Sequence, residues 1–332
     1  MHKEFIQKGD NVFAIQRKST ETCKSYIKNN SDQKQEFYGN VQSEFDSYNL
    51  IAPYLKTPKY KMASLPSVGE VLLIRGVNGE SLESKLKNNS DAVPTLNLLY
   101  SDIFKMWDKT KVAKDEEKMA RNSRLESIQT LGKLNTFFGE NSNLRKNTII
   151  NGQNYSSIYE SFKQVYENLM KGQLENIMVL AHGDEHFGNI FQVENDYQII
   201  DPRCSGFYYP SQTLNTTIGS TLAFNHSFQN QKITENHNNL FLNFTIDPKL
   251  DELLTNFLNL FQKSLDYTQS SILPELLFVN LLRASMGFVN VKNSQKVTTN
   301  KIALLALSQV FYSKTCQIRT NFENNGKKVS VN

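Results

Sequence analysis

Four polar residues near the middle of the chain have the types and spacing of a phosphoryl-transfer site. Asp184 and Asn189 stand in an Asp-x-x-x-x-Asn pattern, with His182 just before them and Asp201 further along. A carboxylate at Asp184 could orient a substrate hydroxyl and accept its proton. Asn189 and Asp201 offer the oxygen ligands that Mg²⁺ prefers. The pattern therefore predicts Asp184 as the catalytic residue, with Asn189 and Asp201 as metal ligands.

Short strands are expected to position these residues. The apolar run at 177–180 is typical of a buried strand that leads into the loop. Residues 190–193 and 197–200 are typical of two strands, and the polar residues between them favour a hairpin turn. Such a hairpin would bring Asp201 back towards Asn189, where both could ligate one cation. The alternative is an ordinary polar loop of an α/β protein.

The sequence His-Gly-Asp-x-His-x-x-Asn, followed by Ile-Asp, resembles the aminoglycoside phosphotransferase and choline kinase family. The resemblance is specific over residues 180–203 and looser elsewhere. It implies a small-molecule kinase with a protein-kinase-like fold that uses ATP and Mg²⁺, in which His182 braces the catalytic loop. Gly183 stands where protein kinases carry an Arg that responds to a phosphorylated activation loop. Regulation of that kind is therefore not expected.

The order of predicted elements fits an α+β, two-lobed kinase-like fold: a small antiparallel β lobe with one helix, then a larger, mainly helical lobe. In the small lobe, strands are expected at 4–7, 12–16, 23–28 and 70–74 and a helix at 40–54. Later helices are expected at 101–135 (broken near 109–115), 157–170, 249–266, 273–289 and 299–315, with a loop over 139–154 and a frayed tail from 324. We predict a nucleotide-binding lobe over 1–78, a hinge near 74–79, and a catalytic and substrate-binding lobe over 79–332.

A lysine on a strand and a glutamate on the following helix are the predicted nucleotide-positioning pair. Lys28 ends the third expected strand, and Glu44 lies on the helix after it, a separation that resembles the strand-Lys to helix-Glu spacing of the family. Lys24 is the alternative lysine, because strand alternation places it on the same face. Asp46 and Glu36 compete with Glu44. The alternative interpretation is that the strand lysine and the helix glutamate are both ordinary exposed surface residues.

The remaining candidates carry weaker signals. No glycine-rich phosphate motif is present, so the phosphate loop would be the turn at Gly9. The resemblance places adenine against the hinge backbone at Ile74 and Gly76. Arg203 could reach a phosphoryl group or an anionic substrate, or it could pair with a carboxylate. Many relatives begin a helix with an Asp soon afterwards; this chain has Ser-Gln-Thr-Leu-Asn at 211–215.

Composition excludes several classes of protein. The chain has 332 residues, 39% of them hydrophobic and 21% charged, which suits a globular protein with an ample core. A net charge of +4 does not indicate a nucleic-acid partner. The absence of an apolar leader or a long apolar run predicts no membrane partner, and the three dispersed cysteines favour a cytoplasmic protein.

Together these observations predict an ATP- and Mg²⁺-dependent phosphotransferase that acts on a hydroxyl of a small molecule, such as a sugar, an aminoglycoside or an amino alcohol. Acidic residues in the C-terminal part are scattered, which disfavours a polycationic aminoglycoside. Two alternatives stay open: a catalytically silent nucleotide-binding scaffold, and a kinase that acts on a protein partner. The sequence leaves the acceptor, the choice between ATP and GTP, and the oligomeric state open.

Overall fold

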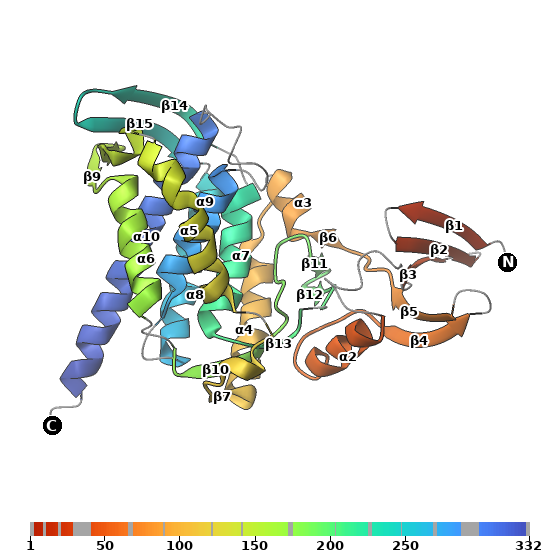
Figure 1. Ribbon diagram of the computed structural model, residues 1–332. Coiled ribbons are helices and arrows are strands. Elements are labelled where there is room, and N and C mark those ends of the chain that lie inside the picture. The colour runs from red at the N-terminus through yellow and green to blue at the C-terminus, as the bar shows by residue number, and fades with distance from the viewer. Residues whose placement is uncertain are drawn as a thin grey trace. The chain divides into compact units, whose positions relative to one another are not determined.

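The computed structural model describes most of the chain (Figure 1), namely residues 3–8, 11–18, 21–28, 41–65, 69–88, 90–120, 122–140, 142–171, 175–202, 204–224, 228–246, 248–267, 271–286 and 299–329. It divides into two compact units. The first unit comprises residues 1–111, 118–120 and 179–208, and the second comprises 112–117, 121–178 and 209–332. The expected lobe boundary at 78/79 falls inside the first unit and stays a prediction.

An antiparallel sheet of five strands opens the first unit. Its strands are β1 (Lys3–Lys8), β2 (Asn11–Lys18), β3 (Glu21–Lys28), β4 (Tyr60–Leu65) and β5 (Gly69–Arg75), in the order β1-β2-β3-β5-β4. The four strands expected in this part of the chain are confirmed. β4 is an addition, because its sequence, Tyr-Lys-Met-Ala-Ser-Leu, has little of the apolar alternation by which strands are found.

Helix α2 (Val41–Ile51) packs on this sheet, as the sequence predicts for 40–54. Its Tyr48 is fully buried against Leu72 and Ile74 of β5. The Tyr48 ring also stacks on Tyr60 of β4, with ring centroids 4.6 Å apart. Aromatic burial of this kind fixes the position of α2 on β4 and β5, which lie beside it in Figure 1.

The rest of the first unit carries the loop of interest. It contains α3 (Leu82–Lys87), α4 (Val93–Thr110), β6 (Glu80–Ser81), β11 (Ile190–Val193), β12 (Asp196–Ile199), β13 (Gly206–Tyr208) and the end of β10 (Ile177–Ala181). One small sheet has the order β12-β11-β6, and β10 pairs antiparallel with β13. The strand before the loop and the hairpin after it are therefore confirmed.

Helices dominate the second unit. They are α5 (Ser123–Glu140), α6 (Ile158–Lys171), α7 (Pro210–Phe224), α8 (Pro248–Ser264), α9 (Leu273–Met286) and α10 (Thr299–Val329). Short 3₁₀ turns occur at η2 (Ser142–Arg145) and η3 (Leu265–Tyr267), and η1 (Glu116–Lys118) lies where the chain passes between the units. Among the described helices, none combines the length and the apolar character needed to cross a bilayer.

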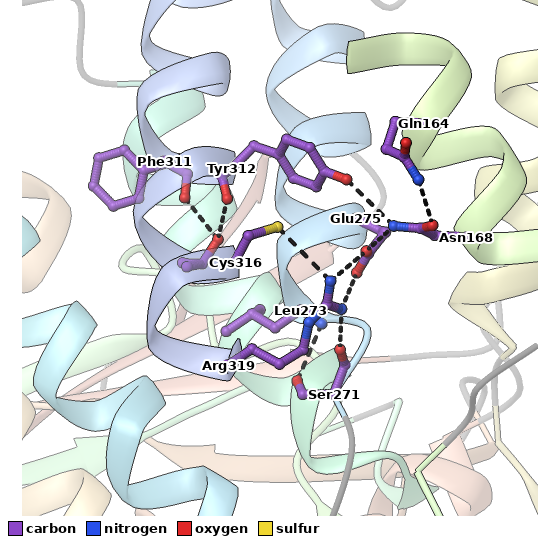
Figure 2. Close-up of polar contacts among 10 residues, drawn as sticks. Gln164, Asn168, Ser271, Leu273, Glu275, Phe311, Tyr312, Cys316 and Arg319 are labelled. Carbon is purple, nitrogen blue, oxygen red and sulfur yellow. Dashed lines mark hydrogen bonds and ion pairs between the residues drawn. The ribbon is translucent and has the colours of Figure 1, made fainter. Parts of the chain in front are cut away.

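Helix α10 runs well past residue 315, so the expected frayed tail from 324 is wrong up to Val329. The extension contains Arg319, whose guanidinium makes a two-pronged ion pair with the buried Glu275 of α9 (Figure 2). An inward-facing Arg interrupts the apolar periodicity that marks a helix in a sequence. The helix therefore continues beyond the residues over which its apolar periodicity can be recognised.

The loop expected over 139–154 is also wrong. Strands β8 (Asn147–Ile150) and β9 (Gln153–Tyr155) form a hairpin there, with Asn151 and Gly152 at positive φ in the turn. They belong to a sheet ordered β14-β15-β8-β9, where β14 is Phe228–Glu235 and β15 is Asn239–Ile246. β15 pairs with β8 in parallel. One partner of β8 is thus distant in sequence, and the segment around this short strand is mostly polar.

A carboxylate from elsewhere in the chain lies at the start of α7, whose first turn contains no acidic residue of its own. Buried Glu175 accepts a hydrogen bond from the Ser211 backbone N–H at 3.2 Å. Burial raises the pKa of Glu175 to about 7. A negative charge is favourable at this end of a helix, so its ionised form stabilises the α7 start.

Candidate active site

His182 holds the loop after β10 to the end of the β11–β12 hairpin. Its ring is fully buried, with Nε2 2.9 Å from the Ile200 carbonyl oxygen. The Asp184 backbone N–H donates to Nδ1 at 3.3 Å, so Nε2 carries the proton that Ile200 accepts. Burial lowers the pKa of His182 to about 4. The neutral ring therefore joins two segments, which is the arrangement that a bracing residue needs.

Gly183 occupies a position that other residues fit poorly. Its φ is +85°, in the left-handed region. A Cβ atom here would overlap the Cys204 carbonyl oxygen and come within 2.7 Å of the Tyr208 hydroxyl. The segment that leads into β13 thus passes directly beside the loop, and an Arg at this position would have no room.

Asn189 fixes the backbone and the side chain of Asp184 together. Its Nδ2 donates to the Asp184 carbonyl oxygen at 3.0 Å and to Asp184 Oδ2 at 3.2 Å. Asn189 is buried, whereas the Asp184 side chain remains 41% exposed. The carboxylate is therefore held in one orientation and is still accessible to a ligand. Because Nδ2 makes both bonds, Oδ1 of Asn189 is the atom left for a cation.

His186 adds a second contact to the same carboxylate. Its Nδ1 accepts from the Gly188 backbone N–H at 3.0 Å, which leaves the proton on Nε2. Nε2 lies 3.7 Å from Asp184 Oδ2. The ring thus both closes the turn and faces Asp184.

Glu185 is a buried carboxylate that the sequence did not single out. Its Oε1 accepts from the Gly183 N–H at 3.1 Å, and burial raises its pKa to about 7. Oε2 is buried without a hydrogen-bond partner in the described part of the chain. A charged residue beside Asp184 is expected at the surface, so its pattern gave no signal of this internal bond.

The β11–β12 hairpin brings Asp201 back to Asn189. The Ile200 N–H donates to the Asn189 carbonyl oxygen at 3.0 Å. Asp201 is the next residue after Ile200, so its backbone lies close to Asn189. Asp201 has φ +62°, a conformation that is uncommon for a residue with a side chain. Its own N–H donates to the Tyr48 hydroxyl at 3.3 Å. The predicted return of the hairpin therefore places Asn189 and Asp201 in one neighbourhood.

Helix α2 presents Glu44 and Tyr48 one turn apart, on the same face. Glu44 is only 2% exposed, and Tyr48 contacts the Asp201 backbone as described above. In the sheet, Lys28 is the register partner of Leu72, and Tyr26 is that of Ile74. Because Leu72 and Ile74 pack against α2, the Lys28 position lies on the sheet face that α2 covers.

Lys24 shares that face by alternation, but its register partner is Ile15 of β2, beyond the pairs that β3 makes with β5. Backbone register therefore favours Lys28 as the partner of Glu44. The side chains of both lysines lie outside what the structure describes, and the pairing stays a prediction.

Of the four remaining predicted site residues, the structure describes two. Ile74 lies within β5, opposite Tyr26 and Tyr60, and Gly76 follows directly after the strand. Gly9 and Arg203 lie outside the described residues. The roles predicted for these four residues at the hinge and on the phosphates stay predictions.

The oxygen donors present suit a Mg²⁺ ion shared with a nucleotide. Asn189 offers an amide oxygen and Asp201 a carboxylate, both hard ligands. No group of three or more His, Cys, Asp and Glu side chains within the described residues could hold a metal ion alone. Mg²⁺ commonly takes one or two protein ligands together with phosphate oxygens and water, so this donor set fits that ion.

Comparisons with known proteins bear on the fold. No protein-family model and no curated protein sequence matches the chain. Among solved structures, it is similar to a choline/ethanolamine kinase family protein from Mesorhizobium loti, with a TM-score of 0.50, 12% identity, and coverage of 96% of this chain and 92% of the other. It is also similar to an amicoumacin kinase solved with AMP-PNP, Ca²⁺ and Ami, with a TM-score of 0.50, 11% identity, and coverage of 97% and 88%. The mixed helix-and-sheet chain therefore has a kinase-like fold, as the residues at 180–203 predict.

Proposed function

We propose that the protein is an ATP- and Mg²⁺-dependent phosphotransferase that phosphorylates a hydroxyl group of a small molecule. The observation that carries this proposal is the bond pattern of Asn189, which fixes Asp184 on one side and meets the Asp201 hairpin on the other. One loop thus combines an accessible carboxylate with adjacent oxygen donors. Phosphoryl transfer needs that combination.

Each residue has a separate part in the proposed reaction. Asp184 would accept a hydrogen bond from the acceptor hydroxyl, orient its oxygen and take its proton. Asn189 Oδ1 and Asp201 would hold Mg²⁺, which when bound neutralises charge on the nucleotide phosphates. Lys28, held by Glu44, would position those phosphates, and His182 would keep the loop in place.

The same proposal includes a two-lobed arrangement, with a nucleotide-binding lobe over 1–78, a hinge near Ile74 and Gly76, and a catalytic lobe over 79–332. The kinase-like fold supports it, as does the structural neighbour that was solved with AMP-PNP and Ca²⁺. We propose Mg²⁺ as the physiological ion and a cytoplasmic location. A silent nucleotide-binding scaffold and a protein kinase are the two rival functions.

ADP release measured with a panel of acceptors tests the proposal. The panel contains neutral sugars, choline, ethanolamine, an aminoglycoside and a generic protein, each with ATP and Mg²⁺. ADP release stimulated by a small molecule supports the proposed function. Stimulation by the protein alone would support the second rival, and no stimulation combined with nucleotide binding would support the scaffold.

Nucleotide is expected to stabilise the protein only when the divalent ion is present. At a Mg²⁺–ATP concentration 100 times the dissociation constant, linkage adds about 2.7 kcal/mol to the free energy of unfolding. Thermal unfolding with ATP–Mg²⁺, GTP–Mg²⁺ and ATP–EDTA measures this stabilisation and shows whether the protein prefers adenine or guanine nucleotides. An unchanged melting temperature with every nucleotide would exclude nucleotide binding and with it the kinase proposal.

Replacement of Lys28 by Ala is expected to raise the KM for ATP substantially, because the phosphates lose a positioned cation. Lys24→Ala is the matched control on the same strand and is expected to be close to neutral. Steady-state kinetics with varied ATP measure both variants. If Lys24→Ala were the damaging change, the assignment of the strand lysine would move by four residues, from Lys28 to Lys24.

A further inference from the structure

A cavity of about 640 Å³ lies in the second unit, between α6 and α10 and beside the end of β9. Its walls are formed by Asn154, Tyr155, Ser156, Glu160, Ser161, Gln164, Gln309, Tyr312, Ser313, Cys316, Gln317, Thr320 and Asn321. We call it the α6–α10 cavity. Its volume is typical of small-molecule sites, and none of Asp184, Asn189 and Asp201 belongs to its walls.

The lining chemistry selects the kind of ligand. Amides and hydroxyls predominate among the described lining residues, which include no Lys or Arg, so these residues offer an anion no counter-charge. Glu160 is the one carboxylate among the described lining residues. Its Oε1 lies 2.7 Å from the ammonium of Lys163, which offsets the negative charge that would attract a cation. Tyr155 and Tyr312 add aromatic rings that suit the apolar face of a sugar ring. Such walls match a neutral ligand with many hydroxyl groups.

A hydrogen-bond network that runs from exposed Gln164 to buried Glu275 supports one wall of the cavity (Figure 2). Asn168 receives a bond from Gln164 Nε2 at 2.8 Å, and its own Nδ2 donates to Glu275 Oε1 at 2.9 Å and to the Tyr312 hydroxyl at 3.3 Å. Glu275 is held in turn by Arg319. Gln164 and Tyr312 therefore stand in set orientations before any ligand arrives. Such preorganisation lowers the entropy cost of binding.

Gln309 forms another part of the wall and is almost fully buried. Its Nε2 donates to the Ser156 carbonyl oxygen at 2.6 Å and to Ser161 Oγ at 3.3 Å. Its Oε1 has no hydrogen-bond partner within the described ranges. Buried acceptors without a partner are rare in proteins.

We propose that the α6–α10 cavity binds a neutral, hydroxyl-rich ligand, such as a sugar or a sugar alcohol. Uncharged amides and hydroxyls recognise such a ligand by donating and accepting at once, and the tyrosine rings cover its apolar face. Binding at this cavity requires no nucleotide and no phosphoryl transfer. Loss of kinase activity would therefore leave it intact.

Binding measured by calorimetry and by saturation-transfer NMR, without nucleotide, tests the assignment. The probes are glucose, maltose and ribitol, with choline and inorganic phosphate as charged comparisons. At least one neutral probe is expected to bind and the charged ones are not. Failure of all three neutral probes, or binding of choline or phosphate alone, would overturn the proposal.

Variants of α10 locate the bound probe. Thr320→Trp fills the cavity from an exposed lining position and is expected to weaken binding more than tenfold. Lys314→Trp, at an exposed position of the same helix that does not line the cavity, is expected to leave the affinity unchanged. Gln317→Ala should weaken binding about fivefold, the loss of one hydrogen bond. Equal affinity of the Thr320→Trp variant and the parent would show that the ligand binds elsewhere.

Discussion

Asp184→Asn is expected to lower kcat by about 100-fold or more and to leave the affinity for Mg²⁺–ATP within a few-fold. The amide keeps the shape of the side chain, but it cannot take the proton of the acceptor hydroxyl, and such base and orientation effects have about this size. Asn189 holds Asp184 from the backbone as well as from the carboxylate, so the loop should keep its position. Turnover with the acceptor found in the ADP-release panel, together with nucleotide titration, measures both quantities.

Two comparison variants separate chemistry from binding. Asp201→Asn removes a charged oxygen ligand, so it should weaken metal-dependent nucleotide binding as well as turnover. Asp196 begins β12 of the same hairpin and forms an exposed ion pair with Lys56, so Asp196→Asn should change neither quantity much. If the Asp184→Asn and Asp201→Asn variants both turned over like the parent, this loop would not be the active site.

Arg319→Met is expected to reduce the free energy of unfolding by about 3–5 kcal/mol, because it leaves a buried charge without its partner. Glu275 is 1% exposed, and Arg319 Nη1 and Nη2 lie 3.0 and 3.1 Å from its two carboxylate oxygens. The guanidinium also donates to the Ser271 carbonyl oxygen at 2.8 Å. Denaturant unfolding, with the midpoint and slope fitted together, gives the change.

Lys314→Met is the matched control, since Lys314 lies on the same helix and is exposed. Its effect should stay within about 0.5 kcal/mol. The double variant with Glu275→Met should recover most of the loss, because an apolar pair of similar volume often replaces a buried ion pair without cost. A loss below about 1 kcal/mol for Arg319→Met would show that the pair contributes little.

The sequence predicts the loop well because its requirements are local. Gly183 has to be Gly for the backbone to turn, and the strands on either side of the loop are short apolar runs. The hairpin that returns Asp201 to Asn189 is encoded by two strands and a polar turn between them. Each signal lies within a few residues, so no knowledge of distant contacts was needed.

What could not be predicted depends on distant partners. β8 is a four-residue run within a mostly polar segment, and it pairs with β15 far along the chain. Helix α10 continues beyond its apolar pattern, where Arg319 pairs with Glu275. Glu175 and Glu185 look like surface residues, yet both are buried carboxylates that accept backbone N–H groups. Charge in a sequence indicates exposure on average, and burial with a specific partner overrides it.

The parallel pairing of β8 with β15 bears on the order in which the chain folds during synthesis. β8 leaves the ribosome well before residues 239–246 have been synthesised. The edge of β8 that pairs with β15 therefore stays unpaired while α6 and α7 are synthesised. Pairing at such sequence separation is slow, because closure of a long loop costs entropy before contacts form. Truncated chains that end before β15 are therefore expected to expose an unpaired strand edge and to aggregate, and the full chain should depend on chaperones most during that interval.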